Sequence, residues 1–227
     1  MLNTLNTSLL SIDIVSDVVC PWCYVGKRRL EAALAQRARE EREPVRVRWL
    51  AFQLNPDIPV GGVDRRSYLE CKFGGPERAK QIYARIKAAG DEVGIHFDFE
   101  RIVRQPNTFD SHRLIAWAQD TQPDSSDALV ERLFRAYFTE GIDIGDVAEL
   151  ARLAGDAGFD TDAAHEWLIS DAGRSAIAAE EQHARALGIS GVPFFIFNQR
   201  LAVSGAQPAE VLLDAMVQAQ MATEHAT

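Results

Sequence analysis

The stretch that decides the fold is Cys20-Pro21-Trp22-Cys23, a pair of cysteines separated by two residues. Before it, residues 9–15 read Leu-Leu-Ser-Ile-Asp-Ile-Val, an alternating and β-branched pattern that is typical of a strand. After it, residues 26–40 carry apolar side chains at helical spacing and predict an amphipathic helix. Pro21 suits the first helical position, because its missing N–H would have no backbone partner there. The cysteine pair is therefore predicted at a corner where a strand turns into a helix.

That corner favours a reactive sulfur at Cys20. The first N–H groups of a helix lack backbone partners, and the helix dipole places about half a positive charge at this end. A thiolate on Cys20, at the N-cap, would accept these N–H groups, so we expect Cys20 to reach solvent and to be nucleophilic near neutral pH. Cys23, one turn into the helix, is expected to be less exposed and suited to resolve a mixed disulfide. The pattern favours a redox pair over two inert core cysteines.

The number and spacing of the cysteines argue against a disulfide-stapled scaffold and against a zinc site. Three cysteines in 227 residues are too few for a disulfide-stapled scaffold. Zinc usually takes four closely spaced ligands, whereas only Cys71 and five scattered histidines accompany the pair. We therefore expect no metal site. Cys71 is interpreted as a helix residue without a role.

Composition excludes several classes of protein. The chain is 47% hydrophobic and 25% charged, which is ordinary for a globular protein. Its net charge of -9 repels phosphate backbones, so nucleic acid is not expected as a partner. No run approaches the ~20 apolar residues of a membrane helix. Residues 1–8 lack the basic start of a secretory signal. We expect a cytoplasmic protein with no membrane partner.

The rest of the chain predicts a second β region separated from the first by helices. Residues 45–54 alternate again and should form a strand parallel to the first, with a right-handed crossover. A last β region, residues 191–197 and 201–204, predicts a hairpin, and a final helix begins at Pro208 and frays from Met221. Between residues 64 and 187 no segment indicates a convincing strand. Helices are expected there near residues 75–93, 107–119, 124–138, 146–157, 161–169 and 171–187.

This order of elements resembles the thioredoxin fold and, more narrowly, the DsbA superfamily and its cytoplasmic FrnE-like proteins. The residues that carry the resemblance are Asp17–Gly26, Asn107-Thr108 with His112-Arg113-Leu114, Gly188–Phe194 and Val203–Pro208. The resemblance implies an α/β protein, a thioredoxin fold with a large inserted all-helical domain. Residues 8–63 and 188–227 would form the thioredoxin-like domain, and residues 64–187 the insertion. Some FrnE-like proteins carry a second cysteine pair near the C-terminus, but this chain has no cysteine after Cys71.

The resemblance also implies a site. Cys20 and Cys23 would be catalytic, and a cis peptide bond between Val192 and Pro193 would face them, leaving the Val192 backbone free to pair with an extended substrate. The residues alone would favour an ordinary trans proline at the start of a strand. Those expected to contact substrate are Pro21, Trp22, Asn55, Val192 and Pro193.

The implied activity is thiol–disulfide exchange on protein or glutathione substrates, by a monomer or homodimer. No tightly bound cofactor is expected, and glutathione is a candidate co-substrate. His112 is interpreted as a structural hydrogen-bonding residue. The sequence does not decide whether Asp17 caps the helix or modulates the proton affinity of the cysteines.

Two other functions stay open. The first is a glutathione-dependent isomerase or transferase, resembling the 2-hydroxychromene-2-carboxylate isomerases and kappa-class transferases, which typically place serine where Cys20 stands. Asn55, Val192, Gly205 and Ala206 fall where that branch holds glutathione. The second is a non-catalytic binding protein with a groove between its domains. The side chains that could line the groove are Trp22, Phe52, Phe73 and Phe109, although large apolar residues are more often core.

Overall fold

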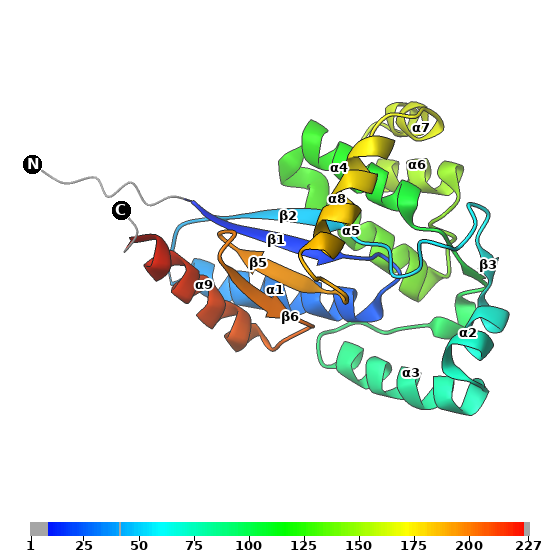
Figure 1. Ribbon diagram of the computed structural model, residues 1–227, viewed down its shortest axis with the longest axis horizontal. Helices are drawn as coiled ribbons and strands as arrows, with labels where there is room; N and C mark the ends of the chain where they lie inside the picture. Colours follow the sequence, from blue (N-terminus) through cyan, green and yellow to red (C-terminus); the bar gives the residue numbers. More distant parts are fainter. Residues whose placement is uncertain (1–8, 41, 225–227) are drawn as a thin grey trace, which may run out of the picture.

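The computed structural model describes residues 9–40 and 42–224 and confirms the predicted β-α-β unit (Figure 1). The expectations for residues 1–8 and for the last three residues of the tail lie outside the described residues. Strand β1 (Leu10–Ser16) leads through a short turn into α1 (Pro21–Arg39), and β2 (Val45–Ala51) follows. The two strands pair in parallel along their whole length. The turn between β1 and α1 is the predicted corner.

The hairpin at the other end of the chain completes a four-stranded sheet of order β2-β1-β5-β6. Strands β5 (Phe194–Phe197) and β6 (Leu201–Ser204) are antiparallel, and β5 also pairs antiparallel with β1. Asn198 and Gln199 between them have positive φ angles of 48° and 56°, as a tight hairpin turn requires. The final helix α9 (Ala209–Glu224) keeps its helical backbone past Met221, where fraying was expected.

The helical segment between the two β regions is largely as predicted. It contains α2 (Arg65–Phe73), α3 (Pro76–Asp91), α4 (Phe109–Thr121), α5 (Ser126–Arg135), α6 (Val147–Asp156), α7 (Thr161–Ile169) and α8 (Arg174–Ala186). Short turns of 3₁₀-helix, η1 (Phe99–Arg101) and η2 (Pro123–Ser125), and of π-helix, η3 (Ala136–Glu140), complete it.

Two predictions for this segment are wrong. Strands β3 (Val63–Asp64) and β4 (Arg104–Gln105) form an antiparallel bridge where only helices were expected. Each has two residues, too few for an alternating pattern to show. The single helix expected over residues 124–138 is divided into η2, α5 and η3.

The sheet is covered on both faces. Leu10, Ile12 and Ile14 of β1 lie in the main core, which also includes residues of α1 and α9. Val15 of β1 instead belongs to a smaller cluster with Ala184 near the end of α8, which crosses the other face (Figure 1). The alternation of β1 thus fixes which helix covers which face.

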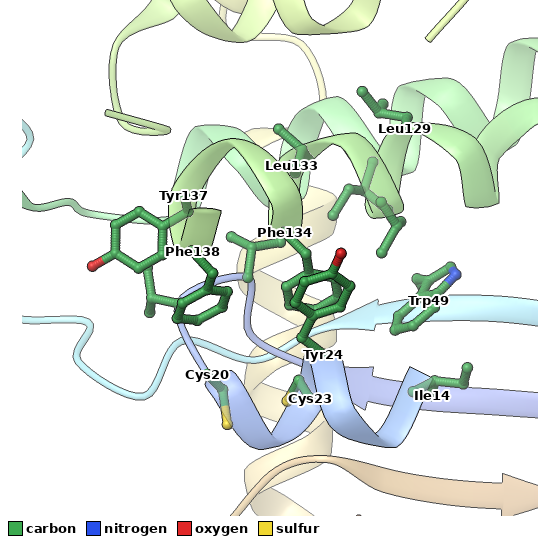
Figure 2. Close-up of a cluster of buried hydrophobic side chains, with 14 of the residues drawn as sticks. Ile14, Cys20, Cys23, Tyr24, Trp49, Leu129, Leu133, Phe134, Tyr137 and Phe138 are labelled. Atoms are coloured by element: carbon green, nitrogen blue, oxygen red, sulfur yellow. The ribbon is translucent and has the colours of Figure 1, made fainter. Parts of the chain in front are cut away.

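A stack of aromatic rings joins α1 to the helical segment (Figure 2). The ring of Tyr24 on α1 lies 5.0 Å from that of Phe134 on α5, nearly parallel, and Phe138 continues the stack. The main core therefore runs from the sheet into the helices. The division into domains at residues 63/64 and 187/188 stays a prediction.

A fully buried cation ties α4 to the end of α7. The Arg113 side chain is 0% exposed and its guanidinium donates to four backbone carbonyl groups, those of Trp167, Leu168, Ser170 and Ala172. It also pairs with Asp110 at 2.7 Å. The last carbonyl groups of a helix have no hydrogen-bond donor within the helix, and here the Arg113 guanidinium is their donor. Among the described helices, none has the length and apolar character needed to cross a membrane.

Candidate active site

The cysteine pair occupies the predicted corner. Cys20 is the N-cap of α1, with extended φ and ψ angles of -93° and 111°, and Pro21 is the first helical residue. The Cys20 N–H donates to the Asp17 carbonyl at 2.9 Å, and the Cys20 carbonyl accepts the N–H of Cys23 at 3.0 Å. Figure 2 shows both sulfur atoms at the first turn of α1. Both cysteines are free thiols.

The expectation that Cys20 reaches solvent is wrong, because Cys20 is only 5% exposed. Its Sγ lies 3.6 Å from the Val192 carbonyl oxygen, to which the thiol donates. No side-chain bond to the helix N–H groups is formed. A protonated sulfur has a proton to give, so it turns to a carbonyl, whereas only a thiolate gains strongly from N–H donors. Cys23 is 1% exposed, so Cys20 is the more exposed of the pair, as expected.

The loop that contacts Cys20 has the backbone implied by the resemblance. The peptide bond between Val192 and Pro193 is cis. Pro193 packs against α1 at Gly26, where an added Cβ would come within 2.9 Å of the proline ring. The Pro193 carbonyl accepts the Gly205 N–H at 2.8 Å. Gly26 therefore lets the loop approach the helix closely enough for Val192 to meet the sulfur.

The two thiols differ in their surroundings. Burial raises the pKa of the Cys23 thiol well above its ordinary value of 9.0, and the hydrogen bond and charge of Cys20 raise it further. The Ser16 hydroxyl opposes this, since it is close enough to lower the pKa of Cys23. Even so, Ser16 completes no hydrogen bond of good geometry with any described residue. At neutral pH Cys23 therefore keeps its proton.

Asp17, whose role the sequence left undecided, is a buried carboxylate close to the cysteine pair. It accepts the Leu54 N–H at 2.8 Å and the Val19 N–H at 3.4 Å. Its Oδ1 lies 3.6 Å from Nε2 of His112, which is also buried. Asp17 thus joins the turn after β1 to the chain after β2 and to α4. The motif spacing could not show this, because His112 comes from the helical segment, 95 positions along the chain.

The other residues expected at the site lie in several places. Trp22 is exposed, at 38%, beside the cysteines. Asn55 lies in the loop after β2 and accepts a hydrogen bond from the Tyr68 hydroxyl at 2.8 Å. Gly205 bonds to Pro193 as described, and the Ala206 carbonyl accepts from Arg29 of α1 at 2.6 Å. The structure therefore brings Val192 and Pro193 to Cys20, and it places Gly205 and Ala206 next to that loop.

The aromatic residues considered for a binding groove have separate environments. Phe52 is buried under Arg185, Phe73 meets the edge of Tyr83, and Phe109 lies under Arg174. Cys71 is exposed on α2. Within residues 9–40 and 42–224, no group of three or more metal-ligating side chains gathers.

A CxxC pair at the first turn of a helix, in contact with a cis-proline loop that leads into a mixed four-stranded sheet, is typical of thioredoxin-fold proteins. Residues 11–217 match the model of the DSBA-like thioredoxin domain family, so the chain belongs to that family. This confirms the resemblance to the DsbA superfamily and the fold class, a thioredoxin fold with a helical insertion.

Three solved structures are similar over nearly the whole chain. A probable DsbA oxidoreductase from Streptomyces coelicolor is 33% identical, with a TM-score of 0.81 over 92% of this chain and 89% of that one. A 2-hydroxychromene-2-carboxylate isomerase is 16% identical, with a TM-score of 0.68 over 96% and 99%. The cytosolic disulfide reductase DsbM from Pseudomonas aeruginosa, solved with glutathione, is 17% identical, with a TM-score of 0.60 over 95% and 98%.

Proposed function

We propose that the protein is a FrnE-like thiol–disulfide oxidoreductase in which Cys20 attacks and Cys23 resolves. The observation that carries this assignment is the asymmetry of the pair. Cys23 is sealed in the core with a raised pKa, while Cys20 lies at the helix N-terminus with its sulfur against the loop at Val192. In such an arrangement one cysteine reacts first with the substrate, and the other reacts later, when it resolves the mixed disulfide.

The exchange begins when the Cys20 thiol, which donates to the Val192 carbonyl in the reduced protein, gives its proton to solvent, and the resulting thiolate attacks one sulfur of a substrate disulfide. A bond forms between Cys20 and that sulfur, the substrate S–S bond breaks, and the electron pair leaves with the released thiolate. Cys23 then loses its proton and attacks Cys20, which forms the Cys20–Cys23 disulfide and releases the second substrate thiolate. The substrate is reduced by two electrons and the pair is oxidised; oxidation of a dithiol substrate is the reverse.

The loop before β5 is the part of the site that receives substrate. The Val192 carbonyl contacts Cys20 in the reduced protein, so an incoming disulfide has to take its place at the sulfur. The backbone of Val192 would then pair with an extended chain, and Pro21, Trp22, Pro193 and Asn55 would surround it. Glutathione suits this role as a small thiol co-substrate, which is supported by the fold shared with DsbM. We place the activity in the cytoplasm.

A glutathione-dependent isomerase is the second candidate, favoured by one observation. The isomerase fold extends over 96% of this chain, including the helical segment. Against it, an isomerase has no need of a resolving thiol, and here Cys23 lies directly behind Cys20.

The test is turnover of a peptide–glutathione mixed disulfide with reduced glutathione. Wild-type protein is expected to accelerate the reduction at least about 100-fold over the uncatalysed reaction, and Cys71→Ser is expected to match wild type. Turnover of 2-hydroxychromene-2-carboxylate that persists in Cys23→Ala, with no disulfide reduction by either protein, would instead establish the isomerase.

A further inference from the structure

Two buried polar atoms behind the turn between β1 and α1 form no hydrogen bond with the described residues. Ser16 Oγ and His112 Nε2 are both inaccessible to solvent, and neither completes a hydrogen bond with any residue in the described part of the chain. A buried polar group without a hydrogen bond is unfavourable, so each such group in a folded protein requires an explanation. The two come from distant parts of the sequence, the end of β1 and the first turns of α4.

A small cavity connects these two atoms. Ser16 and His112 both line it, together with Glu180 of α8 and apolar residues. About 10 Å³ is open to the centre of a water molecule, which is room for one. A water there would have the hydroxyl, the imidazole and the carboxylate as partners. The Ser16 hydroxyl is also close enough to the Cys23 thiol to lower its pKa, so one residue both lines the cavity and lies next to the resolving cysteine.

Two acidic side chains lie close to His112, one from the turn after β1 and one from α8. Asp17 Oδ1 lies 3.6 Å from Nε2, and Glu180 faces the ring from α8. Glu180 is held in place by the Ala51 N–H, which donates to it at 2.8 Å. Other titratable groups that act on these residues are Cys23 on the side of Ser16, Tyr137 near Asp17, and Arg48 and Asp13 near Glu180. An imidazolium formed here would have a carboxylate on either side.

We propose that Ser16 and His112 form a buried proton path that serves the resolving step. The proton of Cys23 passes to the Ser16 hydroxyl as that hydroxyl gives its own to the water in the cavity, and the water gives a proton to Nε2 of His112. Cys23 is left as a thiolate that attacks Cys20, and the electron pair of the broken S–S bond leaves with the substrate thiolate. This path rests on the proposed oxidoreductase function and adds to it the route of the proton.

The path predicts that Ser16 and His112 affect the second step of exchange and not the first. Ellman's reagent separates the steps, because one coloured thiolate leaves when Cys20 attacks and a second leaves when Cys23 attacks. All variants are made in a Cys71→Ser background, since Cys71 is exposed and would react too. In Ser16→Ala and His112→Gln, we expect the second phase to slow about 10- to 100-fold near neutral pH, with the first phase changed less than about twofold.

The pH profile separates proton transfer from a structural effect. Hydroxide can take the proton of Cys23 in place of the path. The slowing of the second phase in Ser16→Ala, relative to the Cys71→Ser parent, should therefore decrease steadily from about pH 6.5 to about pH 9. The control is Ser111→Ala on α4, which also removes a buried hydroxyl, here one that donates to the Ile144 carbonyl at 2.6 Å. It should leave both phases unchanged.

Three results would overturn the proposal. The first is a second phase of normal rate in Ser16→Ala, and the second is a second phase slowed equally at every pH; either would show that Ser16 has no part in proton transfer. The Ser16→Ala result is sufficient for this test even if His112→Gln does not fold. The third is the absence of the first phase in the Cys71→Ser parent, which would contradict the oxidoreductase function itself and therefore also the proton path.

Discussion

Cys20→Ser is expected to lose disulfide turnover entirely, down to the uncatalysed rate. A serine oxygen cannot form the mixed disulfide, so no later step can take place. Cys23 does not substitute for it, because its thiol is 1% exposed and burial raises its pKa. The substitution replaces one atom at an N-cap position that serine favours, so α1 should keep its stability. The measurement is reduction of the peptide–glutathione mixed disulfide, with circular dichroism to confirm folding.

The same variant separates the two candidate functions. Proteins of the isomerase type typically have serine at this position, so Cys20→Ser should keep or gain glutathione-dependent isomerase turnover if that is the function. Cys71→Ser is the matched control, since it removes a free thiol from α2 and should leave turnover unchanged. Disulfide turnover that survives in Cys20→Ser would contradict the assignment.

Arg113→Met is expected to lower the free energy of unfolding by about 4 kcal/mol. The side chain is 0% exposed, and the substitution removes the guanidinium from four buried backbone carbonyl groups and from Asp110. The Trp167 carbonyl still accepts from the Ser170 hydroxyl and Asp110 still pairs with Arg174, whereas the carbonyl groups of Leu168, Ser170 and Ala172 lose their side-chain donor. Removing one partner of a buried charged network usually costs about 3–5 kcal/mol. Arg113→Lys should recover only part of this loss, because one ammonium cannot reach carbonyl groups that the planar guanidinium spans. Denaturant unfolding measures the difference.

Arg174→Met is the control for that prediction. Arg174 also pairs with Asp110, at 3.4 Å, but its side chain is 44% exposed. A solvent-exposed pair contributes about 0–1 kcal/mol, so Arg174→Met should change stability by less than about 1 kcal/mol. Equal effects of the two substitutions would show that the carbonyl groups around Arg113 find other donors.

The sequence was sufficient for the parts of the fold that have strong local patterns. The alternation of residues 9–15, the Pro21 helix start and the repeat of the pattern at residues 45–54 predicted the β-α-β unit and its corner. The hairpin after Pro193 was predicted in the same way. The cis peptide bond came only from the resemblance, because nothing in a Val-Pro dipeptide distinguishes cis from trans.

The parts that could not be predicted depend on contacts between distant segments. Cys20 is covered because Val192, 172 positions away, places its carbonyl on the sulfur. His112 looked like an isolated polar residue on a helix, and only the fold brings it to Asp17. Ser16 ended a strand pattern and gave no sign that it would face Cys23. Such features follow from packing, which a one-dimensional pattern does not encode.

The most direct test of the central claim is a peptide map of Cys23→Ser after reaction with oxidised glutathione. Without the resolving thiol, the mixed disulfide should persist, and mass spectrometry should find glutathione on the peptide that contains Cys20. A map with glutathione on Cys71 alone, and with Cys20 unmodified, would contradict the account.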